Sequence, residues 1–316
     1  MVDADSRSDV RSAVVSSHLY PFEGRYVDHG SFRQHVLDEG PRDGPPVVML
    51  HGNPTWSFFW RRLVLELRTD HRVIVPDHVG CGRSDKPGRD AYPYSLERRI
   101  QDVDTVLDQL DVEGPITLCV HDWGGMIGLS WAVRNPERIA RLVILNTGAF
   151  PLPAAKPLPW EIAACRAPLV GPLLTRGLNA FVEGAIRKCT VRPLPSDVAA
   201  AYRAPYDSWA NRVAVLEFVR TIPLRESDVG YDIVQATADG LATLRDRPTL
   251  ICWGERDFVF DHHFRAEFER RLPDAEVHRF PDAGHYVLED AGDEIAAHVR
   301  AFLTRTGQLG NAVEAG

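Results

Sequence analysis

The sequence predicts an α/β fold with a mostly parallel central sheet, helices on both faces of the sheet and an inserted helical cap. Short apolar runs typical of buried strands recur along the chain and alternate with segments of helical periodicity, which is the pattern of a doubly wound sheet. One proline-rich stretch, residues 151–224, lacks a strand pattern and interrupts the alternation. A chain of 316 residues, 44% of them hydrophobic, can bury a large core around such a sheet.

Buried strands are predicted where apolar residues follow one another, because helices cover a parallel sheet on both faces. RYVDHG and FRQHVLDEG, separated by a turn with glycine, predict an N-terminal hairpin before these strands, and EVHRF at 276–280 predicts one more strand after them. Five runs fit the buried pattern: VVMLHG at 47–52, RVIVPD at 72–77, ITLCVHD at 116–122, RLVILN at 141–146 and PTLICWG at 248–254.

Helices are predicted between these strands. The clearest one spans residues 95–110, where apolar residues recur at three- and four-residue spacing after Ser95, a suitable N-cap. A C-terminal helix is expected over DEIAAHVRAFLTR, at 293–305.

The chain therefore divides by pattern. An insertion as long as 151–224 exceeds the length of an ordinary loop, so we predict that it is a helical cap. Residues 20–150 and 225–305 are expected to form the core that carries it. The two ends, 1–19 and 306–316, are expected to be flexible.

Composition excludes several classes of function. A formal charge of −8 and scattered Lys and Arg residues offer no basic surface for nucleic acid. The first residues lack the features of a signal peptide, and no apolar run approaches the roughly 20 residues of a membrane helix. Five cysteines without a CxxC pair indicate reduced thiols. We expect a cytoplasmic protein without a nucleic-acid or membrane partner and leave its oligomeric state open, a homo-oligomer included.

The segment LCVHDWGG, residues 118–125, joins a predicted strand to a predicted helix through small residues. This is the pattern of a nucleophile elbow, in which a strained turn presents the attacking side chain. Asp122 stands where G-x-S-x-G has serine, which removes the nucleophile of a serine esterase. Taken alone, Asp122 could equally serve as the N-cap of the following helix.

Three other segments favour the catalytic interpretation. LHGNPTW places His51, Gly52 and Asn53 in the loop that completes the oxyanion hole of α/β-hydrolases. WGERDF places Asp257 after one strand, and DAGHYVLE places His285 after the next. Nucleophile, acid and base thus follow the chain order of an α/β-hydrolase fold.

Four motifs, HGNPTWSFFWR, PDHVGCGRSDKP, VHDWGGMIGLSWA and DAGHYVLED, resemble the haloalkane dehalogenase family of α/β-hydrolases over residues 20–305. The resemblance implies that Asp122 displaces halide from carbon and that His285, oriented by Asp257, activates the water that hydrolyses the resulting ester, giving alcohol and halide. It also implies that Asn53 and Trp123 bind the halide. Serine would leave an ether, which water could not cleave.

The third acid at Asp257, together with Asn53 and Trp123, is similar to subfamily III. That subfamily also includes β-lactone decarboxylases of long-chain olefin biosynthesis, which convert a cis-3-alkyl-4-alkyloxetan-2-one to an olefin and CO2. The cap segments NTGAFPLPAAKPLPW and APYDSWANR resemble this group. A dehalogenase-like hydrolase is the main hypothesis and the decarboxylase is the alternative, so the substrate is a small apolar haloalkane or β-lactone, with water.

Two further hypotheses stay open. An epoxide hydrolase would use cap tyrosines as acids, and Tyr202 and Tyr206 are the candidates. A non-catalytic binding protein on the same fold would need no intact set of catalytic residues. No cofactor is expected. A metal site is not expected either, because adjacent side chains on a helix point apart, although one could be drawn from His262, His263, Asp257 and Asp261.

Overall fold

The computed structural model describes residues 15–314, and its framework is one eight-stranded sheet with the order β1-β2-β4-β3-β5-β6-β7-β8. β1 and β2 form the predicted antiparallel hairpin, and β2 is also antiparallel to β4. The remaining neighbours are parallel. The strands are β1 Arg25–Asp28, β2 Arg33–Glu39, β3 Pro46–Leu50, β4 Arg72–Pro76, β5 Ile116–Asp122, β6 Ile139–Thr147, β7 Thr249–Gly254 and β8 Glu276–Phe280.

Helices cover both faces of this sheet, as predicted for an α/β-hydrolase fold. Side chains alternate along a strand, so Val48 and Leu50 pack into one apolar cluster while Val47 and Met49 pack into the other. The first cluster is covered by α2 Leu96–Gln109, α3 Trp123–Arg134, α9 Tyr231–Gly240 and α10 His262–Arg271. The second is covered by α1 Arg61–Leu67, α11 Val287–Asp290 and α12 Gly292–Glu314.

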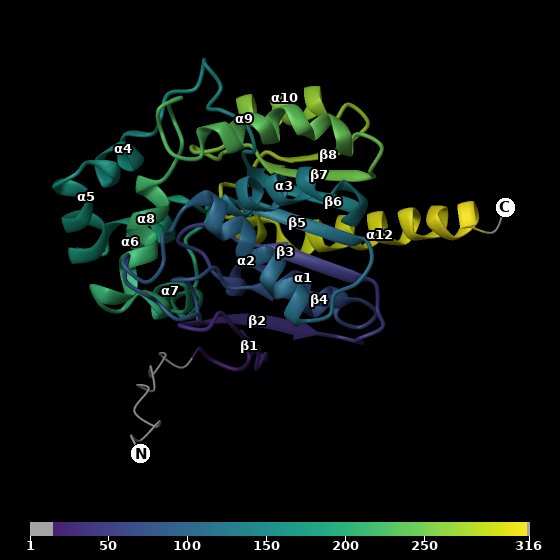
Figure 1. Ribbon diagram of the computed structural model, residues 1–316, viewed down its shortest axis with the longest axis horizontal. Coiled ribbons are helices and arrows are strands. Elements are labelled where there is room, and N and C mark those ends of the chain that lie inside the picture. Colours follow the sequence, from purple (N-terminus) through teal and green to yellow (C-terminus); the bar gives the residue numbers. More distant parts are fainter. Residues whose placement is uncertain (1–14, 315–316) are drawn as a thin grey trace.

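The segment between β6 and α9 contains only helices and connections. Figure 1 shows its helices gathered at one end of the strands, while α12 extends in the opposite direction. That residues 151–224 form a cap separate from the core stays a prediction. The helices are α4 Trp160–Arg166, α5 Val170–Pro172, α6 Ala180–Lys188, α7 Ser196–Arg203 and α8 Val213–Arg220, with a π-helical turn, η3, at Leu173–Gly177.

The predicted start of the helix after Ser95 is confirmed, and the predicted end of the C-terminal helix is corrected. The Ser95 hydroxyl accepts a hydrogen bond from the backbone N–H of Arg98 at 3.2 Å, so Ser95 caps α2 as predicted. The C-terminal helix, in contrast, continues beyond Arg305 to Glu314. No proline stops it, and the glycines after Arg305 cost a helix only about 1 kcal/mol each.

At the N-terminus, residues 1–14 lie outside the described residues. Residues 16–20 form a turn in which the Ser16 carbonyl accepts from the N–H groups of Leu19 and Tyr20, and Val15 and Leu19 pack against the second apolar cluster. The last residues of the segment 1–19 thus contact the core, and the expectation of flexible ends stays a prediction. All five cysteines are buried and unpaired. Within the part of the chain described, no helix combines the length and apolar character needed to cross a bilayer.

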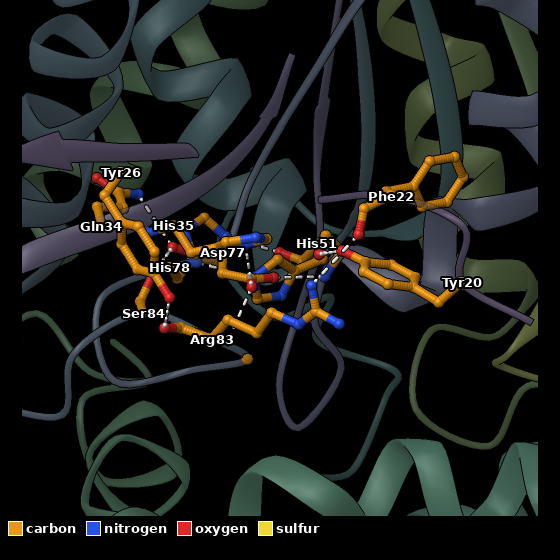
Figure 2. Close-up of polar contacts among 12 residues, drawn as sticks. Tyr20, Phe22, Tyr26, Gln34, His35, His51, Asp77, His78, Arg83 and Ser84 are labelled. Carbon is orange, nitrogen blue, oxygen red and sulfur yellow. Dashed lines mark hydrogen bonds and ion pairs between the residues drawn. The ribbon is translucent and has the colours of Figure 1, made fainter. Parts of the chain in front are cut away.

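Asp77, directly after β4, is a fully buried carboxylate that ties three segments together (Figure 2). Its Oδ1 accepts from the backbone N–H of Ser57 at 2.6 Å. Its Oδ2 accepts from His35 Nδ1 and from the N–H of Arg83, each at 2.9 Å. Burial raises the pKa of Asp77, but these hydrogen bonds and the nearby histidines lower it by more. The net pKa lies below its usual value, so the carboxyl stays ionised. The loop that carries Asn53 and the loop at 78–84 are both fixed to this group.

We expect Asp77→Ala to lower the free energy of unfolding by about 3–5 kcal/mol, because it leaves buried donors unpaired. The measurement is urea denaturation followed by circular dichroism. Asp282→Ala is the control: Asp282 pairs with Arg256 on the surface, where its side chain is 81% exposed, and its loss should cost under about 1 kcal/mol. Equal losses in the two variants would contradict the role of Asp77.

Candidate active site

Asp122 occupies a sharp turn between β5 and α3. Its backbone has φ 50° and ψ −127°, a conformation that non-glycine residues rarely adopt and that costs about 1–3 kcal/mol. The Thr147 hydroxyl, at the end of β6, donates to the Asp122 carbonyl at 2.5 Å. The side chain of Asp122 is buried and lines two cavities. It is not a helix cap, since it makes no capping hydrogen bond to α3.

Three glycines make room for this turn. A Cβ on Gly52 would lie 2.1 Å from Asp122 Oδ1, and one on Gly124 would lie 2.0 Å from the Leu50 carbonyl oxygen. A Cβ on Gly125 would lie 1.8 Å from the Thr147 hydroxyl. The glycines of the HGN and DWGG motifs are therefore required because neighbouring side chains, and at Gly124 the backbone of β3, approach too closely for a Cβ. The elbow interpretation expects such close packing.

The structure brings Asp122, His285 and Asp257 together. His285 Nε2 lies 3.3 Å from Asp122 Oδ2, and His285 Nδ1 lies 2.8 Å from Asp257 Oδ2. Because a carboxylate can only accept, Nδ1 carries the hydrogen and donates to Asp257. All three side chains are buried, and they come from the carboxyl ends of β5 and β7 and from the loop after β8.

Asp257 is held by four donors. Its Oδ1 accepts from the N–H groups of Val259 at 2.7 Å and Phe260 at 3.0 Å. Its Oδ2 accepts from Asn146 Nδ2 at 3.0 Å as well as from His285. The Asn146 carbonyl oxygen in turn accepts from the N–H of Gly254 at 2.8 Å. Asn146, the last residue of the predicted strand RLVILN, is not among the predicted site residues, yet in the structure it orients Asp257.

The charges of the site support one another. Burial lowers the pKa of His285, yet the carboxylates of Asp257 and Asp122 raise it more, to about 10. Burial raises the pKa of Asp122, and the hydrogen bond and charge of His285 bring it below its usual value. At neutral pH the resting site therefore holds an imidazolium between two carboxylates.

Asn53 and Trp123 flank Asp122 as predicted. The backbone N–H of Asn53 donates to Asp122 Oδ1 at 2.8 Å, whereas Oδ2 faces His285. The Asn53 side chain donates one N–H to the Val215 carbonyl at 3.2 Å and has a second N–H. Within residues 15–314, the indole N–H of Trp123 has no acceptor, and Trp123 lines one cavity beside Asp122. Both residues can therefore offer N–H groups to an anion.

Two neighbours of this site gave no signal in the sequence. His121 Nε2 donates to the His285 carbonyl at 2.9 Å, and burial lowers the pKa of His121 to about 3, so its ring is neutral. Arg99 is fully buried and stacks on Phe218, with its guanidinium carbon 3.7 Å from the centre of that ring and 5.3 Å from the centre of the Trp123 ring. Arg99 thus supports the ring of Trp123 from behind. Only the folded chain shows these contacts.

Other candidates lie away from the reacting atoms. His51 accepts from the N–H of His78 at 2.9 Å and holds the loop rather than facing the site. The hydroxyl of Tyr202 donates to Glu289 at 2.5 Å, and that of Tyr206 donates to the Thr55 carbonyl at 3.3 Å. Among the described residues, no tyrosine lines either cavity that reaches Asp122. The acids that an epoxide hydrolase needs are therefore not placed for that role.

The prediction that the side chains of His262 and His263 point apart is wrong. The rings of His262 and His263 do not point apart: their centres are 4.0 Å apart, and both lie near Asp261. Asp261, however, accepts from the Lys156 ammonium at 2.9 Å and from the N–H of His263 at 3.0 Å. A cation is already supplied there by Lys156. Asp257 is not part of this group of residues, because it binds His285 beside Asp122.

A strained carboxylate between a parallel strand and a helix, with a histidine and a second acid at neighbouring strand ends, defines an α/β-hydrolase. Similarity to known proteins leads to the same class. The alpha/beta hydrolase fold family matches residues 45–292, and the chain belongs to it, within the group formed by haloalkane dehalogenases and their decarboxylase homologues.

Three relatives illustrate the range of this group. The chain is 50% identical to a cis-3-alkyl-4-alkyloxetan-2-one decarboxylase of Shewanella oneidensis, over 93% of this chain and 92% of that protein. It is 34% identical to a haloalkane dehalogenase of Mycolicibacterium paratuberculosis, over 90% and 93%. The crystal structure of the haloalkane dehalogenase DatA from Agrobacterium tumefaciens matches with a TM-score of 0.82 at 26% identity, over 92% and 99%. The relatives favour the alternative hypothesis over the main one.

We expect Gly124→Ala to destabilise the elbow by about 1–3 kcal/mol or more, because its Cβ meets backbone that cannot rotate away. Thermal unfolding measures this loss. The matched control is Gly184→Ala in α6, where an added Cβ meets nothing within 4 Å and helix propensity should instead add up to about 1 kcal/mol. A neutral Gly124→Ala variant would contradict the close-packed elbow.

Proposed function

We propose that this protein decarboxylates cis-3,4-dialkyl β-lactones to an alkene and CO2. The observation that supports this most is the 50% identity, over 93% of the chain, to a protein described as a cis-3-alkyl-4-alkyloxetan-2-one decarboxylase. The site is consistent with this substrate. Apart from Asp122, His285 and the amide of Asn53, its two cavities are lined almost entirely by apolar side chains, as a neutral molecule with two hydrocarbon chains requires.

In the first step, Asp122 Oδ2 attacks C4 of the lactone from the side opposite the ring oxygen. The C4–O bond breaks, and its electron pair stays on the oxygen, so the product is an alkyl ester of Asp122 that carries a free carboxylate on C3. This is the same displacement at saturated carbon that the dehalogenase hypothesis assigns to Asp122. The N–H groups of Trp123 and Asn53 can receive the new carboxylate where a halide would otherwise lie.

In the second step, the ester fragments. The C3–C(carboxylate) bond breaks to release CO2, its electron pair forms the C3=C4 double bond, and the C4–O bond to Asp122 breaks, which restores the free carboxylate. No water, proton or cofactor is consumed. Inversion at C4, followed by departure of the two groups from opposite faces, gives a cis alkene from a cis lactone.

His285 would act in this sequence as a donor. In the fragmentation, negative charge returns to Asp122 Oδ2, and the imidazolium 3.3 Å away stabilises it. Asp257 keeps the imidazolium oriented through Nδ1. If water reached the ester, a His285 that had lost its proton could activate it, and the product would be a β-hydroxy acid.

A dehalogenase activity remains the second candidate. It is favoured by the relative at 34% identity and by solved dehalogenase structures that share the fold. Once Asp122 is alkylated, its charge is gone, one cause of the high pKa of His285 disappears, and His285 can accept the proton of a water. The same three side chains would then complete a hydrolysis.

The two functions separate by product. We expect the purified wild type to release the cis alkene and CO2 from a cis-dialkyl β-lactone, measured by gas chromatography, with much slower halide release from bromoalkanes of matched length. Asp122→Ala should abolish both reactions, because it removes the carboxylate proposed to attack. Halide release without any alkene would reject the decarboxylase and retain the dehalogenase.

The pH dependence tests the protonation state of His285. Because the pKa of His285 is raised to about 10, the imidazolium is present below that pH and is lost above it. We expect kcat/KM for alkene formation to be flat at neutral pH and to fall as the pH rises through about 10. Asp257→Asn removes one cause of the raised pKa and should move the fall to lower pH. A profile that rises with pH over this range would contradict a donor role for His285.

A further inference from the structure

Two cavities meet at the nucleophile. The first has a volume of about 100 Å³ and the second about 290 Å³. Asn53 and Asp122 line both cavities, and so do three apolar side chains above them, Ile162, Phe181 and Val259. The two cavities therefore adjoin at Asp122. We call them the first and the second arm, and the place where they adjoin the fork.

The first arm runs along the face of α3 and under the end of α8. Trp123 and Met126 line it near the fork, and Phe150, Phe264 and Ile222 line it further away. Apart from the shared residues Asn53 and Asp122 at the fork, its lining side chains are apolar. A hydrocarbon chain gains about 25 cal/mol for each Å² that it buries in such a space.

The second arm runs between α4 and α6. His285 lines it near the fork, and Cys165, Leu174 and Gly184 line it further away. It reaches the surface at Trp160, whose side chain is 72% exposed, and at the Lys188–Glu161 ion pair. This arm has the larger volume, and among the described lining residues it carries two charged side chains outside the reacting groups, Glu161 and Lys188.

We propose that each arm holds one alkyl chain of the β-lactone: the chain on C3 in the first arm and the chain on C4 in the second. This inference rests on the proposed function. A substrate with a single chain needs one arm, whereas two chains on adjacent ring carbons diverge from the point of attack, as the arms diverge from Asp122. The assignment follows from the anion site. The carboxylate that forms is attached to C3, and Trp123, its donor, lines only the first arm.

The chain on C4 then lies on the side of His285, which lines only the second arm. In this orientation the C4–O bond to Asp122 points toward the imidazolium that assists its cleavage. The first arm has the smaller volume, so it leaves less room for the chain on C3 than the second arm leaves for the chain on C4. The three shared residues at the fork keep the two chains apart.

Each arm can be blocked separately. Gly184 lines the second arm, and a Cβ there would meet nothing within 4 Å, so Gly184→Trp fills the arm without a clash at its first atom. Ile222 is half-buried and lines the first arm, so Ile222→Trp fills that one. Leu65→Trp is the control for a large surface substitution, because Leu65 is exposed on α1 and lines neither arm.

The experiment uses three cis lactones: two long chains, a long chain on C3 with methyl on C4, and the reverse. Gly184→Trp should lower kcat/KM by about tenfold or more for both lactones with a long C4 chain and spare the lactone with methyl on C4. Ile222→Trp should do the same for both lactones with a long C3 chain. Leu65→Trp should match the wild type. If both variants reject the same chain, or neither rejects any, the assignment of the arms is overturned.

Binding of an unreactive ligand separates this inference from the proposed function. A dialkyl ketone with two long chains should bind the wild type in isothermal titration calorimetry and bind each blocked variant at least about tenfold more weakly. A methyl ketone with one long chain should bind both single variants, because one arm stays open, and lose affinity only in the double variant. That pattern without alkene formation would refute the proposed activity and keep the fork. Alkene formation with equal ketone binding in all variants would refute the fork alone.

Discussion

The site depends on the conformation of one residue. Asp122 is held at a positive φ that its side chain disfavours, and it is held there from three directions. At Gly52, Gly124 and Gly125, neighbouring atoms approach so closely that a methyl group would not fit. The register of β5 against β6 shifts between His121 and Asp122, so Asp122 is opposite Thr147, whose hydroxyl binds its carbonyl. Sheet packing supplies the energy that keeps this carboxylate exposed to the cavities.

His285 is held by the same frame. His121, the residue before Asp122, donates to the carbonyl of His285, while Asn146 from the neighbouring strand orients Asp257, which binds the ring of His285. Three parallel strands therefore hold Asp122, His285 and Asp257 through short contacts. Rigid placement of this kind reduces the rearrangement needed when charge moves from Asp122 to a leaving group and back.

Much of this could be predicted from the sequence, for identifiable reasons. Parallel strands are buried on both faces, so continuous apolar runs such as ITLCVHD predict them. The elbow is a local motif, so one short segment predicts the positions of Asp122, Trp123 and the glycines. Contacts between distant segments could not be predicted. The hydrogen bond of Asn146 to Asp257, the stacking of Arg99 on Phe218 and the burial of Tyr202 against Glu289 all depend on tertiary packing. The place where the two cavities adjoin depends on several helices between β6 and α9 at once, and no periodic pattern in the sequence predicts it.

The polar and apolar parts of the site come from different parts of the chain. The atoms that react or bind charge lie at the ends of core strands, whereas residues 151–224 supply most of the apolar lining of both cavities. A substitution in the lining changes the space around the substrate without moving Asp122, His285 or Asp257. The strand ends and the lining are thus two independent determinants: the first fixes the positions of the polar groups, and the second fixes the size and shape of the space that a substrate can fill.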